Sequence, residues 1–187
     1  MQACVDMLGI TPDTTVLDVG GTLFVWTLSP VMPRLTLLNR FPRPADLPAD
    51  VKWVEGDALS LPFHDGQFDV VFSNSVIEHL ETEANQRTFA AEIQRVGRKY
   101  FVQTPDRRFP MEPHLIAPFI HWLPKSWQRV LYPFMPIRFL MPRAELDRAF
   151  AELRLLTATD MRALFPRAAI IVERTLGWPK SVLAIGS

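Results

Sequence analysis

Short apolar runs, each closed by glycine, proline or polar residues, recur through the first half of the chain. The run at residues 16–19 lacks the strict apolar–polar alternation of a half-exposed strand. It therefore predicts a strand buried on both faces, as in a parallel sheet. Further strands are predicted at residues 35–39, 51–55, 68–74 and 99–103. Because a connection separates each strand from the next, the order favours a parallel sheet with crossovers.

Helical patterns flank and interrupt this series. Residues 2–8 predict a short helix that ends at Gly9. Residues 82–96 predict a longer helix, closed by Gly97, because apolar residues recur on one face. Those residues are Phe89, Ala90, Ile93 and Val96.

The last part of the chain adds helices and a hairpin. A helix is predicted over residues 142–156, because proline suits its first position. A short helix is predicted over residues 159–165, with a cap at its first two residues. Residues 169–173 and 181–185 predict two more strands, and the turn at 177–179 is short enough for an antiparallel hairpin. The prediction is a seven-stranded, mostly parallel α/β sheet.

Composition narrows the class of protein. With 187 residues, 48% apolar and 21% charged, the sequence predicts one globular domain. Twenty basic residues balance twenty acidic ones, so no nucleic-acid partner is expected. The lone Cys4 excludes an internal disulfide, and the four histidines lack metal-ligand spacing, so no metal is expected. Without a signal peptide or a long apolar span, a cytoplasmic protein is expected.

Prolines and aromatic residues are concentrated in residues 105–141. This segment is predicted to be an insertion in the single domain. Aromatic residues interleaved with cations suit a membrane interface or a lipid-linked substrate. They suit equally a lid over an apolar pocket, or a second hydrophobic cluster at the sheet edge. The sequence leaves these alternatives open, as it does the oligomeric state.

A glycine pair, Gly20 and Gly21, directly follows the first predicted strand. Glycine lets the backbone turn tightly and approach a ligand closely. In open α/β sheets, ligands bind beyond the carboxyl ends of the strands. The alternative is a buried strand followed by an ordinary turn, since a short glycine motif is a weak signal on its own.

Several motifs occur in a familiar order. They are VLDVGGT at 16–22, GDA at 56–58, LPF at 61–63, FDVVFSNSVIEHL at 68–80 and EIQRV at 92–96. Together these motifs resemble class I S-adenosylmethionine-dependent methyltransferases of the small, ubiquinone-biosynthesis-like type (methyltransferase domain 11-like). The resemblance implies a Rossmann-like, mostly parallel seven-stranded sheet with a C-terminal antiparallel hairpin and helices on both faces. It also implies S-adenosylmethionine as the cofactor.

The resemblance assigns expected roles to cofactor-binding residues. Gly20 and Gly21 would pass close to the methionine part of the cofactor. Asp18 would hold loop N–H groups or the cofactor ammonium. Asp57 would accept a hydrogen bond from the adenine amino group, beside the N–H of Ala58. For each aspartate, the alternative is a purely structural role in a turn.

Ser73 and Asn74, at the end of the fourth strand, would line the crevice near the sulfonium. Their alternative role is that of a polar strand end. Thr22 belongs to the same turn as the glycine pair, where the family usually has a further glycine. Asn39 stands where the family usually has an acidic residue that holds both ribose hydroxyls. A neutral side chain there predicts about tenfold weaker binding.

The resemblance also indicates where a catalytic base would lie. His79 follows the fourth strand with Glu78, and His114 follows the fifth. An oxygen acceptor would gain from such a base, so His79 and His114 are the predicted catalytic residues. A histidine that packs on the sheet is the alternative for His79.

The predicted function is methyl transfer from S-adenosylmethionine to a small-molecule, glycan or lipid-linked acceptor, and peripheral membrane contact is one of the roles left open for residues 105–141. The rival is a catalytically inactive binding or scaffold protein, which Asn39 and the shortened glycine turn favour. A nicotinamide-dependent oxidoreductase is disfavoured, because no Gly-x-Gly-x-x-Gly follows the first strand.

Overall fold

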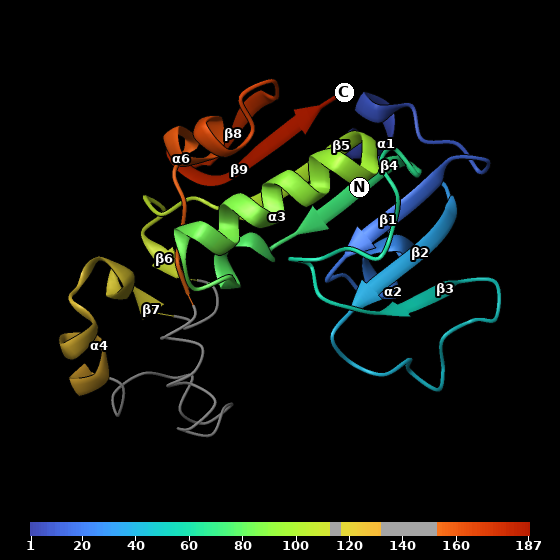
Figure 1. Ribbon diagram of the computed structural model, residues 1–187. Coiled ribbons are helices and arrows are strands. Elements are labelled where there is room, and N and C mark those ends of the chain that lie inside the picture. The colour runs from blue at the N-terminus through green and yellow to red at the C-terminus, as the bar shows by residue number, and fades with distance from the viewer. Residues whose placement is uncertain (113–116, 132–152) are drawn as a thin grey trace.

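The computed structural model describes residues 1–112, 117–131 and 153–187. Seven strands form one sheet in the order β3-β2-β1-β4-β5-β9-β8 (Figure 1). The strands are β1 (Thr15–Val19), β2 (Arg34–Asn39), β3 (Lys52–Glu55), β4 (Phe68–Asn74), β5 (Gly97–Pro105), β8 (Ala169–Thr175) and β9 (Trp178–Gly186). The first five are parallel, and the β8–β9 hairpin joins β5 in antiparallel register. Each strand expected from the sequence is present.

Helices cover both faces of this sheet. On one face, α1 (Gln2–Leu8) and α2 (Leu23–Thr27) contribute to a cluster of buried apolar side chains with β1, β2 and β4. On the other face, α3 (Glu83–Val96) and α6 (Ala158–Leu164) pack on β4, β5 and β9. Figure 1 shows α3 running along the sheet. Because both faces are covered, the β1 residues Val16, Leu17 and Val19 are fully buried, as the run without alternation predicted.

The helix ends differ in part from the prediction. Gly97 follows α3 as expected, but its backbone is extended and already belongs to β5. A side chain there would approach within 2.7 Å of Val71 Cγ2 and 2.8 Å of the Lys99 carbonyl, so close packing requires glycine. The cap of α6 is Thr157, not residues 159 and 160. Thr157 and Asp160 bond reciprocally in a capping box.

Most of the helix predicted over residues 142–156 lies outside the described residues. Residues 153–155 are not helical, and Leu156 forms a bridge with Asp106, so the expected helix end was wrong. The bridge fixes Leu156 beside the end of β5, where its side chain is completely buried. Long-range pairing, which local periodicity does not encode, sets the structure here.

The segment that follows β5, described for residues 106–112 and 117–131, stands apart from the sheet (Figure 1). It contains β6 (Met111–Glu112), β7 (Ala117–Pro118), the 3-10 helix η2 (Ile120–Trp122) and α4 (Lys125–Leu131). Its exposed large apolar side chains are Met111, Phe119, Trp122, Leu123, Trp127 and Val130. Among the described residues, no helix is long and apolar enough to cross a bilayer.

Candidate functional site

A cavity of about 330 Å³ lies over the carboxyl ends of β1 and β2, which we call the β1–β2 pocket. It is lined by Gly20, Leu38, Asn39, Arg40, Phe41, Gly56, Ala58, Ser75, Val76, His79 and Leu80. Its size is at the lower end of the range for small-molecule sites. Of the residues predicted from the sequence, the pocket brings together Gly20, Asn39, Ala58 and His79.

The glycine turn forms the floor of this pocket. Gly20 has φ +77°, and its N–H donates to the Leu38 carbonyl at 2.8 Å, which ties the end of β1 to β2. A side chain on Gly20 would meet Val76 Cγ2 at 2.7 Å. A side chain on Gly21 would overlap the Asp18 carboxylate at 2.0 Å. Both glycines are therefore required by close approach, and Gly21 covers Asp18.

Asp18 lies completely buried beneath the turn. Its Oδ2 accepts a hydrogen bond from Trp26 Nε1 at 2.8 Å, while Oδ1 has no partner among the described residues. Burial raises the pKa of Asp18 to about 7, although the bond from Trp26 opposes this. An unpartnered buried carboxylate oxygen is the kind of acceptor that a cofactor ammonium or a rearranged loop N–H would satisfy.

Asn39 connects the end of β2 to the glycine turn. Its Nδ2 donates to the Gly21 carbonyl at 3.2 Å, and its Oδ1 accepts from the Arg40 N–H at 3.1 Å. An aspartate could not donate to the Gly21 carbonyl. The amide therefore has a local structural role that the resemblance did not predict.

Asp57 is already engaged in hydrogen bonds. Arg40 Nη2 approaches its two oxygens at 3.0 and 3.2 Å, and the Leu59 N–H donates to Oδ1 at 2.9 Å. The bond from Leu59, followed by those from Arg40, lowers the pKa of Asp57. Asp57 does not line the β1–β2 pocket, whereas Ala58 does. Arg40 was missed from the sequence, although its position directly after a strand end was a usable signal.

Three other predicted residues lie outside this pocket. Ser73 is buried and donates to the Val19 carbonyl at 3.1 Å, which joins β4 to β1. Asn74 lines a separate cavity of about 570 Å³ between α1 and the strands β4, β5, β8 and β9. Thr22 is exposed and precedes α2, beside another small cavity. Neighbouring residues of an extended strand alternate between faces, which separates Asn74 from its neighbour.

The candidate bases also occupy different places. His79 ends the 3-10 helix η1 (Ile77–His79) and lines the β1–β2 pocket. Glu78 is completely buried, and its Oε2 accepts from Thr104 Oγ1 at 2.9 Å, which braces η1 against β5. His114 lies outside the described residues. Within the described ranges, no group of three or more His, Cys, Asp or Glu residues is arranged to hold a metal ion.

Comparison with protein families supports a methyltransferase. A family model described as a methyltransferase domain matches residues 15–100. The match begins in β1, ends in β5 and contains every residue of the β1–β2 pocket. A search of curated proteins gives no significant match.

Solved structures share the fold at low sequence identity. The 1,6-didemethyltoxoflavin-N1-methyltransferase of Burkholderia thailandensis, with bound 1,6-didemethyltoxoflavin and S-adenosylhomocysteine, is 15% identical with a TM-score of 0.59. The alignment covers 98% of this chain and 74% of that one. An Aquifex aeolicus S-adenosylmethionine-dependent methyltransferase is 12% identical with a TM-score of 0.53, over 99% and 88% of the chains. A Rhodobacter sphaeroides protein provisionally named a zinc-dependent alcohol dehydrogenase is 17% identical with a TM-score of 0.61, over 96% and 86%.

At these identities, the solved structures show the fold alone. The predicted α/β, Rossmann-like sheet with its C-terminal antiparallel hairpin is confirmed. The fold and the family model together support methyltransferase chemistry with an S-adenosylmethionine-type cofactor.

Proposed function

We propose that this protein transfers a methyl group from S-adenosylmethionine to a small-molecule, glycan or lipid-linked acceptor. The observation that carries the proposal is the β1–β2 pocket. A glycine turn, a polar strand end and a histidine meet there at the carboxyl ends of parallel strands, within the segment that matches a methyltransferase model. The motifs quoted above further favour the small, ubiquinone-biosynthesis-like type.

The pocket offers suitable partners for each part of the cofactor. The backbone at Gly20 and Gly21 would hold the methionine part, with Asp18 beneath the turn. Asn39 would bond the ribose, and Ala58 would lie beside the adenine. Asp57 would serve the adenine amino group after exchanging the bond from Arg40. Bound S-adenosylmethionine supplies an electrophilic methyl group, so the main task of these residues is alignment.

A base contributes when the acceptor is a hydroxyl. Among the described residues, His79 is the candidate base, because it lines the β1–β2 pocket at the end of η1. We assign it the role of accepting the acceptor's proton at an imidazole nitrogen. His114, which lies outside the described residues, remains the second candidate base on the basis of the sequence alone. We expect His79→Gln to reduce turnover about a hundredfold while leaving S-adenosylhomocysteine affinity unchanged.

A non-catalytic binding or scaffold protein is the second candidate. It is favoured by the neutral Asn39 and by the Arg40–Asp57 pair, since both reduce the polar groups open to a nucleoside. The nicotinamide alternative rests only on a fold likeness.

Calorimetric titration separates these functions. The full chain is titrated with S-adenosylmethionine, S-adenosylhomocysteine and NADPH. The proposed function predicts micromolar binding of the first two and none of NADPH. Asp18→Ala and Asp57→Ala should weaken that binding, provided that the variants melt cooperatively. Absence of binding at millimolar S-adenosylhomocysteine would favour the scaffold, and selective NADPH binding would favour the oxidoreductase.

We propose that residues 105–141 form an insertion of the same domain that meets the acceptor or a membrane surface. The exposed side chains of Phe119, Trp127 and Val130 support this interpretation. Flotation with anionic vesicles tests it. We expect the parent to float and Trp127→Ser to float less, with the exposed Phe24→Ser of α2 as a control. A parent that stays with the unbound protein would leave acceptor contact as the role of this segment.

A further inference from the structure

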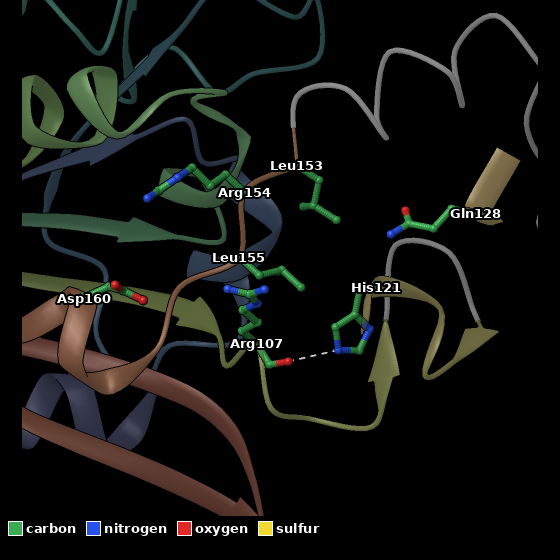
Figure 2. A pocket seen from close by; sticks show the side chains of 7 residues that line it. All are labelled: Arg107, His121, Gln128, Leu153, Arg154, Leu155 and Asp160. Carbon is green, nitrogen blue, oxygen red and sulfur yellow. Dashed lines mark hydrogen bonds between the residues drawn. The ribbon is translucent and has the colours of Figure 1, made fainter. Parts of the chain in front are cut away.

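A second cavity, of about 260 Å³, lies where the insertion meets the body of the protein. We call it the Arg107 pocket. Its lining residues are Arg107, His121, Gln128, Leu153, Arg154, Leu155 and Asp160. Figure 2 shows that they come from the residues after β5, from η2, from α4, from the segment before α6 and from α6 itself. None of these residues is among the site residues predicted from the sequence.

This pocket adjoins the β1–β2 pocket through η1. The Arg154 N–H donates to the Glu78 carbonyl at 2.7 Å, which fixes one wall of the Arg107 pocket to η1. The next residue, His79, lines the β1–β2 pocket. The two cavities therefore flank the same short helix, one residue apart along its backbone.

The backbone of Arg107 is held on two sides. Its N–H donates to the Leu156 carbonyl at 2.9 Å. Its carbonyl accepts from His121 Nε2 at 3.0 Å (the dashed line in Figure 2) and from Trp122 Nε1 at 2.9 Å. The guanidinium, in contrast, has no hydrogen bond or ion pair within the described residues. Arg107 therefore combines a fixed backbone with a cationic side chain that has no partner among the described residues.

The neighbouring arginines are paired with carboxylates, and the Asp160 carboxylate, which keeps its charge, is hydrogen-bonded within the α6 cap. Arg108 pairs with the buried Asp106 at 2.7 Å. Arg154 pairs with Glu83 at 3.2 Å, and in Figure 2 its head group points away from the Arg107 side of the pocket. Asp160 Oδ2 accepts two bonds from Thr157 in the α6 cap. Arg107 is therefore the lining arginine without an ion pair among the described residues; its side chain is exposed, so an incoming anion can reach it.

His121 adds a second unsatisfied group. Because Nε2 faces a carbonyl, it must carry the hydrogen. The other ring nitrogen, Nδ1, is buried and has no partner among the described residues. Such an atom costs free energy unless a ligand or water reaches it. Leu153 and Leu155 supply apolar surface beside these polar groups.

From these observations we infer that the Arg107 pocket binds a compact acidic molecule, a carboxylate or a phosphate ester with an apolar body. The anionic group pairs with the Arg107 guanidinium, and the apolar body contacts Leu153 and Leu155. If the proposed methyltransferase function holds, on which this assignment rests, the pocket is the site for an acidic acceptor beside η1.

Three probes with one ring and different head groups test the inference: benzoate, phenyl phosphate and benzyl alcohol. The reporter is the indole N–H signal of Trp122 in a nitrogen–proton correlation spectrum, identified with Trp122→Phe, because this indole bonds the Arg107 carbonyl. We expect a saturable shift with at least one anion at constant ionic strength, and none with benzyl alcohol. The stronger anion identifies the head group.

Arg107→Gln should weaken the anion about tenfold or more. The matched control is Arg162→Gln, which removes an exposed arginine of α6 and should leave the affinity unchanged. The unshifted Trp122 signal in free Arg107→Gln verifies that the backbone bond survives. Three results would overturn the inference. They are a Trp122 shift with benzyl alcohol equal to that with the anions, an equal loss of anion affinity in Arg107→Gln and Arg162→Gln, and no saturable shift with either anion.

S-adenosylhomocysteine binding is measured on the same samples. If S-adenosylhomocysteine binds but no anion does, the inference that the Arg107 pocket binds an acidic molecule is overturned, and the proposed function is not affected. An anion response without cofactor binding supports the anion site and contradicts its assignment to a methyl acceptor.

Discussion

The β1–β2 pocket and the Arg107 pocket flank one short helix, yet they are built in different ways. The first is lined by residues at strand ends or in the connections that follow them, such as Gly20, Asn39 and Gly56. The second joins the end of β5 to η2, α4 and the segment before α6. In the first, Asn39 and Arg40 are bonded to neighbouring groups and the unsatisfied atom, Asp18 Oδ1, lies beneath the turn, whereas in the second the groups without a partner among the described residues belong to lining residues, Arg107 and His121. Local sequence encodes the first pocket, and only tertiary packing creates the second.

The largest effect expected in the β1–β2 pocket is that of Gly20→Ala. A methyl group there meets Val76 Cγ2 at 2.7 Å and also stands at φ +77°. We expect a loss of about 3 kcal/mol in the free energy of unfolding, measured in urea, and more than tenfold weaker S-adenosylhomocysteine binding.

Gly177→Ala is the matched control for this variant. Gly177 has φ +83°, but no atom lies within 4 Å of the added carbon. Gly177→Ala should lower the free energy of unfolding by only about 1 kcal/mol, which is the cost of backbone strain alone. Equal losses in the two variants would show that close approach to Val76 does not matter.

A smaller effect is expected from the charge beneath the turn. Burial raises the pKa of Asp18 to about 7, above its value in the unfolded chain. The folded state therefore favours the protonated acid. The stability that this preference contributes is fully present below the pKa that Asp18 has in the unfolded chain. It is lost as the pH rises through the pKa that Asp18 has in the folded protein. Between about pH 5 and about pH 8, the parent should lose about 2 kcal/mol of unfolding free energy relative to Asp18→Asn.

Asp69→Asn provides a control of opposite sign. Bonds from Thr15, followed by the charge of Arg98, lower the pKa of Asp69, so its contribution is lost as pH falls through that lowered pKa. The Asp69→Asn substitution should therefore leave the pH dependence of the unfolding free energy unchanged between about pH 5 and about pH 8. A parent and an Asp18→Asn variant with parallel pH profiles would place the titration of Asp18 outside this window.

These effects also explain how much the sequence could predict. The strands follow from local apolar runs, and the glycine pair marks the turn in the sequence, whereas the contact with Val76 that requires Gly20 appears only in the structure. Ser73 and Asn74 were predicted as one pair, yet strand alternation directs Ser73 to the Val19 carbonyl and Asn74 to another cavity.

The remaining differences come from contacts between distant segments. The bridge between Asp106 and Leu156 replaces the predicted helix end, and burial beneath the glycine turn raises the pKa of Asp18, against the bond from Trp26. His121 appeared unremarkable in the sequence because its unsatisfied nitrogen arises only from packing. Spacing along the chain gives no signal for such groups.

Restoring an acidic residue at the end of β2 should have a moderate effect on affinity. Asn39→Asp should strengthen S-adenosylhomocysteine binding about tenfold, because a carboxylate accepts charge-assisted bonds from ribose hydroxyls. It should also lower stability by about 1 kcal/mol, since the bond to the Gly21 carbonyl is lost.

The control is Asn74→Asp, which places the same charge in the separate cavity beside α1. Its affinity for S-adenosylhomocysteine should equal that of the parent in calorimetry. If both variants gain equally, the gain comes from long-range attraction and not from a ribose contact. If Asn39→Asp loses affinity, the amide is itself the ribose ligand.

The smallest effect compares one arginine from each pocket. Arg40 is exposed and paired with Asp57, also exposed, so Arg40→Ala should change the free energy of unfolding by less than about 0.5 kcal/mol. It frees an oxygen of Asp57 and should improve S-adenosylhomocysteine affinity about twofold, because the cofactor no longer displaces the guanidinium. Arg107→Gln should leave that affinity unchanged, since its guanidinium faces the other cavity. A loss of affinity in Arg40→Ala would instead make the guanidinium a direct cofactor contact, and both pockets would then bind through an arginine.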